Sequence, residues 1–266
     1  MTESFREIAI DAAKGAGALL HSHFGAALAL HYKSSPTDLV TEMDHRAEAL
    51  IVEAIRRRYP EHAILAEEQG LLAGASASHR WIIDPLDGTT NYAHGLPMYA
   101  VSIALEVEGR LLLAVIYDPS RRECFVAERG QGASLNDVAI RVSTTTTLNE
   151  SLLSTGYPYN IREARDNNLA EHSFLSLRCH SVRQLGSAVT SLTAVAAGGL
   201  DAFWEIQLGP WDVAGGALLV EEAGGVVTDL AGGPIKLDAP AVVASNGLIH
   251  SEILDALKEA RARRLG

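Results

Sequence analysis

Two aspartates bracket a short turn in the segment Trp81-Ile82-Ile83-Asp84-Pro85-Leu86-Asp87-Gly88-Thr89-Thr90-Asn91. The apolar residues before Asp84 predict a buried strand, and Pro85 predicts the end of that strand because proline has no backbone N–H to donate. Two carboxylates three residues apart on a stiff turn suit a hard divalent cation, which prefers oxygen ligands. Gly88 lets the backbone approach a ligand, and the N–H groups that follow it could hold a phosphate. The alternative, a solvated acidic turn, is disfavoured by the buried lead-in and the Gly-Thr-Thr ending.

Further acidic residues that could join this turn lie in three other segments. Asp44 stands near the start of a predicted helix, where capping is the ordinary role, and Asp212 is a candidate N-cap of a second helix. Glu67 follows a short apolar strand, where a solvated carboxylate is the ordinary alternative. If these residues converge with Asp84 and Asp87, each negative charge raises the pKa of the others. Divalent cations would relieve that repulsion.

The sequence resembles the inositol monophosphatase family of Mg-dependent, lithium-sensitive sugar phosphatases over nearly its whole length. The family signature Asp-Pro-(Ile/Leu)-Asp-Gly-Thr matches residues 84–89. The other motifs of the family occur in order, as a lysine loop with Asp-x-x-Thr-x-x-Asp (Lys33, Asp38, Thr41, Asp44), Glu67-Glu68, Gly186-Ser187-Ala188 and Trp211-Asp212.

The resemblance implies an active site with three groups of residues. The metal ligands, for two to three Mg²⁺ ions, would be Glu67, Asp84, the carbonyl of Leu86, Asp87 and Asp212. The catalytic residues that orient water and accept its proton would be Asp44, Glu67 and Thr89, with Lys33 as an accessory group. The substrate contacts would be Asp87, Gly88, Thr89, Gly186, Ser187, Ala188, Glu205 and Asp212.

The activity implied by the resemblance is hydrolysis of inositol 1-phosphate by a metal-activated water, without a covalent enzyme intermediate. The segment Asn91-Tyr92-Ala93-His94-Gly95 favours the inositol branch of the family. Fructose 1,6-bisphosphate, histidinol phosphate and phosphoadenosine phosphate remain alternative substrates for the same chemistry. A third hypothesis is a regulatory binding protein that kept the fold and lost turnover, and the intact set of acidic residues argues against it.

The composition narrows the class of protein and of partner. The chain has 266 residues, 47% hydrophobic and 21% charged, which is ordinary for a globular protein, and its apolar runs are too short to cross a bilayer. The net charge of −11 argues against nucleic acid or an anionic membrane as the main partner. Two cysteines, Cys124 and Cys179, and no visible signal peptide favour the cytoplasm. By resemblance we expect a homodimer that acts on a small phosphorylated polyol or sugar.

The hydrophobic patterns predict an α+β (mixed α/β) fold. We expect helices at 5–24, 44–58, 161–177, 187–197, 212–223 and 248–261. We expect strands at 63–66, 81–83, 99–107, 111–117, 124–127, 133–135, 140–142, 152–155, 181–185, 201–206, 226–228 and 241–244, with a flexible loop at 70–78.

A weak apolar pattern near residue 150 predicts two parts of the chain. Residues 1–150 would form an α+β half that carries the metal-binding signature, and residues 151–266 an α/β half that completes the site. The resemblance implies a layered αβαβα sandwich of the inositol monophosphatase/fructose-1,6-bisphosphatase type, with the active site between the two halves.

Overall fold

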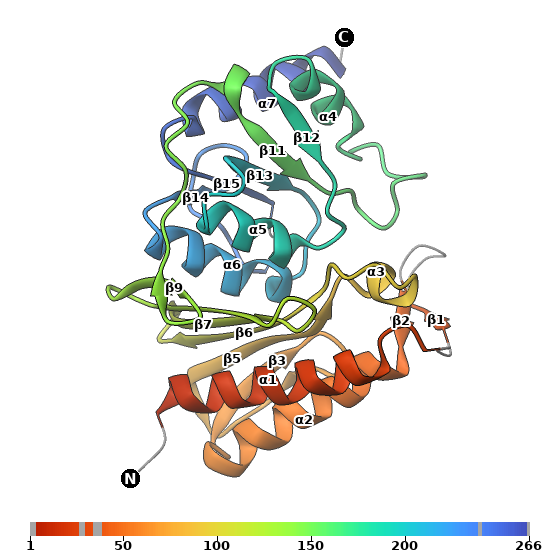
Figure 1. Ribbon diagram of the computed structural model, residues 1–266, viewed down its shortest axis with the longest axis vertical. Helices are drawn as coiled ribbons and strands as arrows, with labels where there is room; N and C mark the ends of the chain where they lie inside the picture. Colours follow the sequence, from red (N-terminus) through yellow and green to blue (C-terminus); the bar gives the residue numbers. More distant parts are fainter. Residues whose placement is uncertain (1–3, 27–29, 34–38, 239–240, 265–266) are drawn as a thin grey trace.

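The computed structural model describes residues 4–26, 30–33, 39–238 and 241–264. Its helices and sheets stack in five layers (Figure 1). An eight-stranded sheet and a five-stranded sheet each have helices on both faces, and one helical layer lies between the two sheets. The prediction of a layered αβαβα sandwich is therefore confirmed.

The large sheet has the strand order β10-β9-β8-β7-β6-β5-β3-β4, and only β3 and β5 run parallel. In the β3–β5 pair Ala66 lies opposite Ile83, so Glu67, the residue that follows β3, lies beside Asp84 of β5. The strands are β3 (His62–Ala66), β4 (Gly70–Leu72), β5 (Ser76–Asp87), β6 (Ala100–Val107), β7 (Arg110–Asp118), β8 (Glu123–Glu128), β9 (Gly132–Leu135) and β10 (Val138–Ala139).

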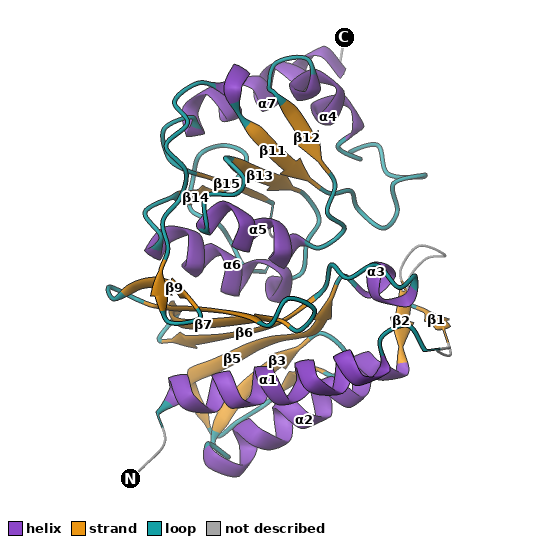
Figure 2. Cartoon of the chain, viewed as in Figure 1, coloured by secondary structure: helices purple, strands orange, loops and turns teal. Residues whose placement is uncertain are grey.

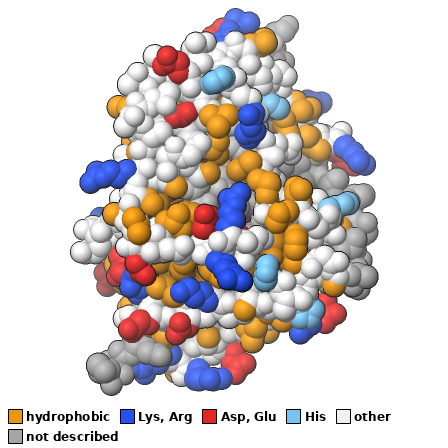
Figure 3. Space-filling model, in the orientation of Figure 1, with side chains coloured by type: hydrophobic (Ala, Val, Ile, Leu, Met, Phe, Trp, Pro, Cys, Tyr) orange, Lys and Arg blue, Asp and Glu red, His pale blue; other side chains and the backbone are white. Residues whose placement is uncertain are grey.

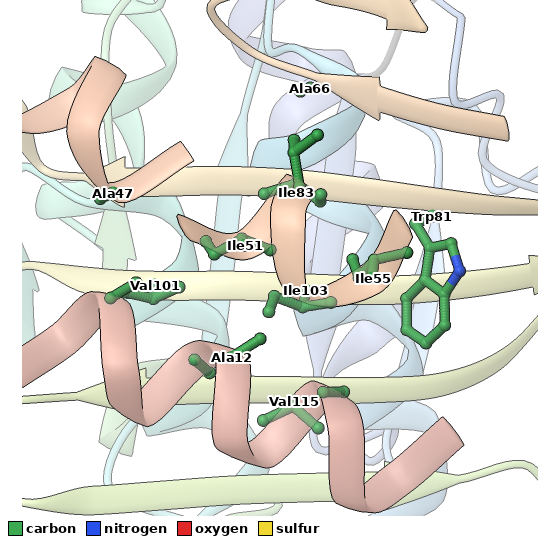
Figure 4. Packing of buried hydrophobic residues seen from close by; sticks show 14 of the residues in the cluster. Ala12, Ala47, Ile51, Ile55, Ala66, Trp81, Ile83, Val101, Ile103 and Val115 are labelled. Atoms are coloured by element: carbon green, nitrogen blue, oxygen red, sulfur yellow. The ribbon is translucent and has the colours of Figure 1, made fainter. Parts of the chain in front are cut away.

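Helices α1 (Phe5–His23) and α2 (Glu42–Arg58) cover the outer face of the large sheet. Figure 4 shows Ile51 and Ile55 of α2 against the strand residues Ile83 and Ile103. All four side chains are fully buried, and burying such a side chain contributes roughly 1.5–3 kcal/mol to folding. This packing fixes α2 firmly on the sheet from which Asp84 and Asp87 emerge.

The start of α2 differs from the prediction. The helix begins at Glu42, and Thr41 is its N-cap, with its side chain accepting from the Met43 N–H. Asp44 is the third helical residue and accepts from the Thr41 N–H at 2.8 Å, which completes a capping box. Thr41 ends the two-stranded ribbon of β1 (Leu30–Tyr32) and β2 (Leu39–Thr41).

The small sheet is mixed, with the strand order β12-β11-β13-β15-β14. Its strands are β11 (Leu152–Thr155), β12 (Ser181–Arg183), β13 (Ala202–Glu205), β14 (Val226–Thr228) and β15 (Val242–Ser245). Helices α5 (Ala188–Ala196) and α6 (Pro210–Glu222) pack between the sheets, and α4 (Leu169–Ser176) and α7 (His250–Arg264) cover the outer face (Figure 2). One apolar cluster joins Ile116 and Phe125 of the large sheet to Leu192 of α5, Leu218 of α6 and Phe203 of the small sheet.

Several local predictions were wrong for identifiable reasons. The helix expected at 161–177 is confined to α4, because the polar segment 162–168 offers no apolar face to bury. The loop expected at 70–78 contains β4 and the start of β5. Strand β5 continues past Pro85 to Asp87 through a break in its pairing with β6, so Pro85 marks an irregularity and not the end. The strand expected at 140–142 is replaced by the shorter β10.

Strands of the large sheet lie within residues 62–139 and those of the small sheet within residues 152–245. Helices α5 and α6 pack against both sheets, so the division of the chain into halves at residue 150 stays a prediction.

Figure 3 shows that charged side chains of both signs are interspersed over the face in view. None of the helices in the described ranges has the length and apolar character needed to cross a membrane.

Candidate active site

Asp84, Asp87 and Asp212 form an aspartate cluster where the large sheet meets α6. Within the described part of the chain, one carboxylate oxygen from each lies within 4.8 Å of those of the other two. Asp84 and Asp87 lie in the irregular end of β5, and Asp212 is the third residue of α6 and accepts from the Gly209 N–H at 2.6 Å. One buried and two half-buried carboxylates at this separation are the oxygen-rich donor set that Mg²⁺ prefers.

The electrostatics of the aspartate cluster are those of a cation site. Burial, with the neighbouring carboxylates, raises the pKa of Asp84 well above its usual range. Burial raises the pKa of Asp212 to about 7 and that of Asp87 to about 6, although hydrogen bonds to Asp87 oppose the change. Protein groups alone thus leave the negative charges uncompensated, and divalent cations would compensate them. The residues therefore fit the metal that the resemblance implies.

Glu67 lies beside this cluster and is paired with Lys33. The Lys33 Nζ lies 2.8 Å from Glu67 Oε1 and also contacts Glu68. Burial raises the pKa of Glu67 to about 8, while the charge of Lys33 opposes the shift. Burial disfavours the charge of Lys33, but the two glutamates reverse this effect and raise its pKa. Asp38, expected in the same motif, lies outside the described residues.

Asp87 is held in place by the N-terminal end of α5. The Ser187 hydroxyl donates to Asp87 Oδ2 at 2.6 Å, and the Val189 N–H donates to the same oxygen at 2.6 Å. Ser187 is also the N-cap of α5, with its Oγ accepting from the Thr190 N–H. The segment expected to contact substrate therefore also orients a candidate metal ligand.

Asp44 and Thr89 form a second hydrogen-bonded group. The Thr89 Oγ1 lies 3.0 Å from Asp44 Oδ1 and 2.9 Å from the carbonyl oxygen of Leu86, so its proton has two alternative acceptors. The other Asp44 oxygen accepts from the Thr41 hydroxyl and N–H. Burial raises the pKa of Asp44, which makes this carboxylate a stronger base than a solvated aspartate.

Gly88 joins β5 to α3 (Thr89–Ala93) in a left-handed conformation, with φ of 92°. A Cβ at this position would lie 2.7 Å from the Met98 carbonyl oxygen, so the tight turn requires glycine. As the N-cap of α3, Gly88 leaves the first N–H groups of that helix available at the surface of the cleft.

Asn91 links α3 to the segment before α5. Its Nδ2 donates to the carbonyl oxygens of Met98 and Leu185, each at 2.8 Å. Gly186 follows in a left-handed conformation, with φ of 73°, and a Cβ there would lie 2.8 Å from the Asn91 amide. The sequence placed Asn91 in the signature but gave it no role, because its partners are backbone carbonyls of distant segments.

These groups line one cleft of about 880 Å³. That volume lies within the range of small-molecule sites. Of the residues expected in the site, the cleft lining includes Lys33, Glu67, Asp87, Gly88, Thr89, Gly186, Ser187, Ala188, Glu205 and Asp212. Burial raises the pKa of Glu205 well above its usual range, and the charges of Asp212 and Asp87 add to the effect. Asp84, Leu86 and Asp44 lie behind the lining and are buried.

Three aromatic side chains also line the cleft. They are Tyr157, Tyr159 and Trp211; Trp211 belongs to a family motif, whereas no sequence pattern predicted a place for the two tyrosines in the site. Tyr159 keeps 57% of its surface exposed and lies near the charges of Asp212 and Glu67. A turn of aromatic residues carries no sequence signal for a cleft, because the turn reaches the site only through the tertiary fold.

A family model described as the inositol monophosphatase family matches residues 1–262. The chain belongs to this family. An inositol-1-monophosphatase of Synechocystis sp. is 44% identical over 96% of this chain and 89% of its own length. The Nus factor SuhB of Escherichia coli is 42% identical over 94% of this chain and 97% of its own length.

Solved structures agree with the family assignment. An inositol monophosphatase from Anabaena (Nostoc) sp. superposes with a TM-score of 0.87 and 43% identity, covering 96% of this chain and 95% of that one. An IMPase/NADP phosphatase complexed with Mg²⁺ and phosphate gives a TM-score of 0.81 at 26% identity, covering 91% of this chain and 90% of that one. Family membership and these neighbours support a phosphatase, in a family that depends on magnesium.

Proposed function

We propose that the protein is a Mg²⁺-dependent phosphomonoesterase that hydrolyses inositol 1-phosphate, or a closely related polyol phosphate, to the free polyol and phosphate. The observation that carries the proposal is the aspartate cluster of Asp84, Asp87 and Asp212 at a cleft that Thr89, the partner of the buried Asp44, also lines. The similarity to inositol monophosphatases at 43–44% identity supports the choice of substrate.

In this proposal the metal ligands are Glu67, Asp84, the Leu86 carbonyl, Asp87 and Asp212, for two to three ions. Bound Mg²⁺ would polarise the phosphate and lower the pKa of a water molecule. Ser187 and Val189 hold Asp87 in a fixed orientation, so the donor set is pre-organised.

Side chains of the protein would accept the proton of the attacking water. A water beside Thr89 could donate to Oγ1, while Oγ1 donates to Asp44 Oδ1 at 3.0 Å. The proton of the water would thus move to Thr89 while the Thr89 proton moves to Asp44, whose raised pKa suits a general base. Glu67, beside the cluster, would assist in orienting the same water.

The substrate would bind with its phosphate at the Gly88 and Thr89 N–H groups. The polyol would face Gly186, Ser187, Ala188, Glu205 and Asp212. Burial raises the pKa of Glu205, and its carboxyl oxygens would accept hydrogen bonds from the hydroxyl groups of the polyol.

The test is phosphate release from inositol 1-phosphate, fructose 1,6-bisphosphate, histidinol phosphate and phosphoadenosine phosphate, with Mg²⁺ and then with EDTA. We expect Mg-dependent release, fastest from inositol 1-phosphate, and loss of most activity in Asp87→Asn. Asp11→Asn, on an exposed position of α1, is the matched control and should keep full activity. Faster phosphate release from another compound would support the proposed reaction but reject inositol 1-phosphate as the preferred substrate.

A second candidate function is a regulatory binding role, favoured by the 42% identity to a protein named Nus factor SuhB. Absence of phosphate release from every compound at saturating Mg²⁺ would favour it. Lithium inhibition, a homodimer and a cytoplasmic location remain further predictions from the family. Inhibition assays, sedimentation and cell fractionation would test them.

A further inference from the structure

Glu48 is a fully buried carboxylate that the proposed chemistry does not use. It lies on α2 four residues after Asp44, so the two side chains project from the same face of the helix. Its Oε2 accepts from the Glu68 N–H at 2.8 Å, and its Oε1 accepts from the Gln69 N–H at 3.1 Å. Both oxygens of one carboxylate therefore bind two consecutive backbone amides.

These bonds fix the segment that carries Glu67. The Glu67 N–H donates to the Ile83 carbonyl oxygen at 3.2 Å, so three successive N–H groups have acceptors from α2 or β5. The Glu67 side chain is thereby tied to the strand that carries Asp84 and to the helix that carries Asp44. We propose that Glu48 is a positioning residue that sets Glu67 in the geometry required for magnesium binding, an inference that rests on the proposed metal role of Glu67.

The chemistry of the contact explains why a carboxylate stands at this position. Two adjacent N–H donors require two acceptors, and an ionised glutamate supplies both. A glutamine keeps the shape but supplies one acceptor, and its NH₂ group would face an N–H. That mismatch leaves one buried donor unpaired, so the segment of Glu67 would shift away from α2.

The primary test is Glu48→Gln in the full-length protein, with Mg²⁺ binding measured by isothermal titration calorimetry. We expect Mg²⁺ affinity to fall by about 10–100-fold, as for other residues that support metal ligands. We expect kcat to approach the wild-type value at saturating Mg²⁺. A variant that melts at a lower temperature in EDTA but binds Mg²⁺ with wild-type affinity would overturn the inference.

Two variants separate positioning from general destabilisation. Glu53→Gln changes an exposed residue of α2 that pairs with Arg57, and it should alter neither stability nor Mg²⁺ affinity by much. Glu171→Gln changes another buried carboxylate, which pairs with Arg261 far from Glu67 in the sequence. It should lower the melting temperature and leave Mg²⁺ affinity unchanged.

A double variant tests whether Glu48 acts through Glu67. If it does, Glu48→Gln combined with Glu67→Gln should bind Mg²⁺ no more weakly than Glu67→Gln alone. Additive losses would reject the inference. If Glu48→Gln fails to fold, Glu48→Asp can replace it. The aspartate keeps both acceptors but is one methylene shorter, so it should give an intermediate loss of Mg²⁺ affinity. Wild-type Mg²⁺ affinity in Glu48→Asp would reject the proposal. Wild-type protein without Mg²⁺ binding would instead reject the proposed function itself.

Discussion

The hydroxyl of Thr89 lies 3.0 Å from Oδ1 of Asp44, although the two residues are 45 positions apart in the chain. One belongs to α3 at the end of the strand β5 and the other to the first turn of α2. Both are buried, so the hydrogen bond joins the helix layer to the end of the sheet at the candidate site.

Removal of the Thr89 hydroxyl should slow the reaction without changing the fold. Thr89→Val keeps the shape of the side chain, and we expect kcat to fall about 10²-fold, the size of a lost general acid–base contribution. Thr89→Ser should keep most of the activity. Thr90→Val alters the exposed neighbour and is the matched control. Steady-state phosphate release measures the effect, and equal rates for Thr89→Val and Thr90→Val would contradict the assigned role.

The stability of the metal-free protein should fall as pH rises from 6.5 to 8. Burial raises the pKa of Asp212 to about 7 and that of Glu67 to about 8, so the folded state holds protons that the unfolded state has already released. The unfolded state then binds fewer protons, and the free energy of unfolding decreases with pH. Urea unfolding in EDTA would measure the slope, and Asp212→Asn should reduce it.

Magnesium should oppose this loss of stability. At a concentration 100 times its dissociation constant, a ligand that binds only the folded state adds about 2.7 kcal/mol to the free energy of unfolding. Binding also requires deprotonated carboxylates, so the stabilisation should grow from pH 6.5 to 8. A Mg²⁺ effect of the same size in Asp212→Asn would show that the ions bind elsewhere.

Gly186→Ala should disturb the contact between α3 and α5. The new Cβ would meet the Asn91 amide at 2.8 Å in a backbone conformation that disfavours alanine. We expect the free energy of unfolding to fall by roughly 1–3 kcal/mol, and we expect KM to change more than in the control variant Gly95→Ala. Gly95→Ala has a similar φ of 72° with open space around its Cβ, so it reports the backbone cost alone. Equal losses in both variants would exclude a role for the Asn91 contact.

His250 should make the protein less stable in mild acid. Its Nδ1 lies 2.8 Å from the Ser245 hydroxyl and its Nε2 lies 2.9 Å from the Thr228 hydroxyl. Burial lowers the pKa of His250, so below about pH 6.5 the unfolded state binds the extra proton and the free energy of unfolding falls. The stability difference between wild type and His250→Asn should therefore shrink from pH 7.5 to 5.5. Urea unfolding at both pH values would measure this difference, and a difference that stays constant would contradict the prediction.

The sequence predicted the motifs of the site better than the contacts that hold them. The strand before Asp84 and the helices after Ser187 and Trp211 follow from short-range apolar patterns. Their convergence needed the family resemblance, because the chain alone does not specify which strand ends adjoin. The parallel pairing of β3 with β5, which brings Glu67 beside Asp84, is such a long-range feature.

Helix α2 shows why the remaining details were missed. The apolar residues of this helix, Leu50 among them, predict its buried face, but Leu50 is 43% exposed and Glu48 is fully buried. A pattern of apolar residues cannot find a buried carboxylate whose partners are the backbone amides of Glu68 and Gln69. The spacing of Asp44 and Glu48 by four residues was the one available signal, since it places both acids on one helix face.

Asp87 depends on Ser187 and Val189 for its orientation, and its neighbour Asp212 comes from α6. During synthesis on the ribosome, a nascent chain that has exposed only its first 150 residues would contain Asp84 and Asp87 without these partners. Such a chain could form the large sheet but no complete metal site. Phosphatase activity would therefore begin only after α5 and α6 have emerged and docked, so a truncated or stalled translation product would be inactive.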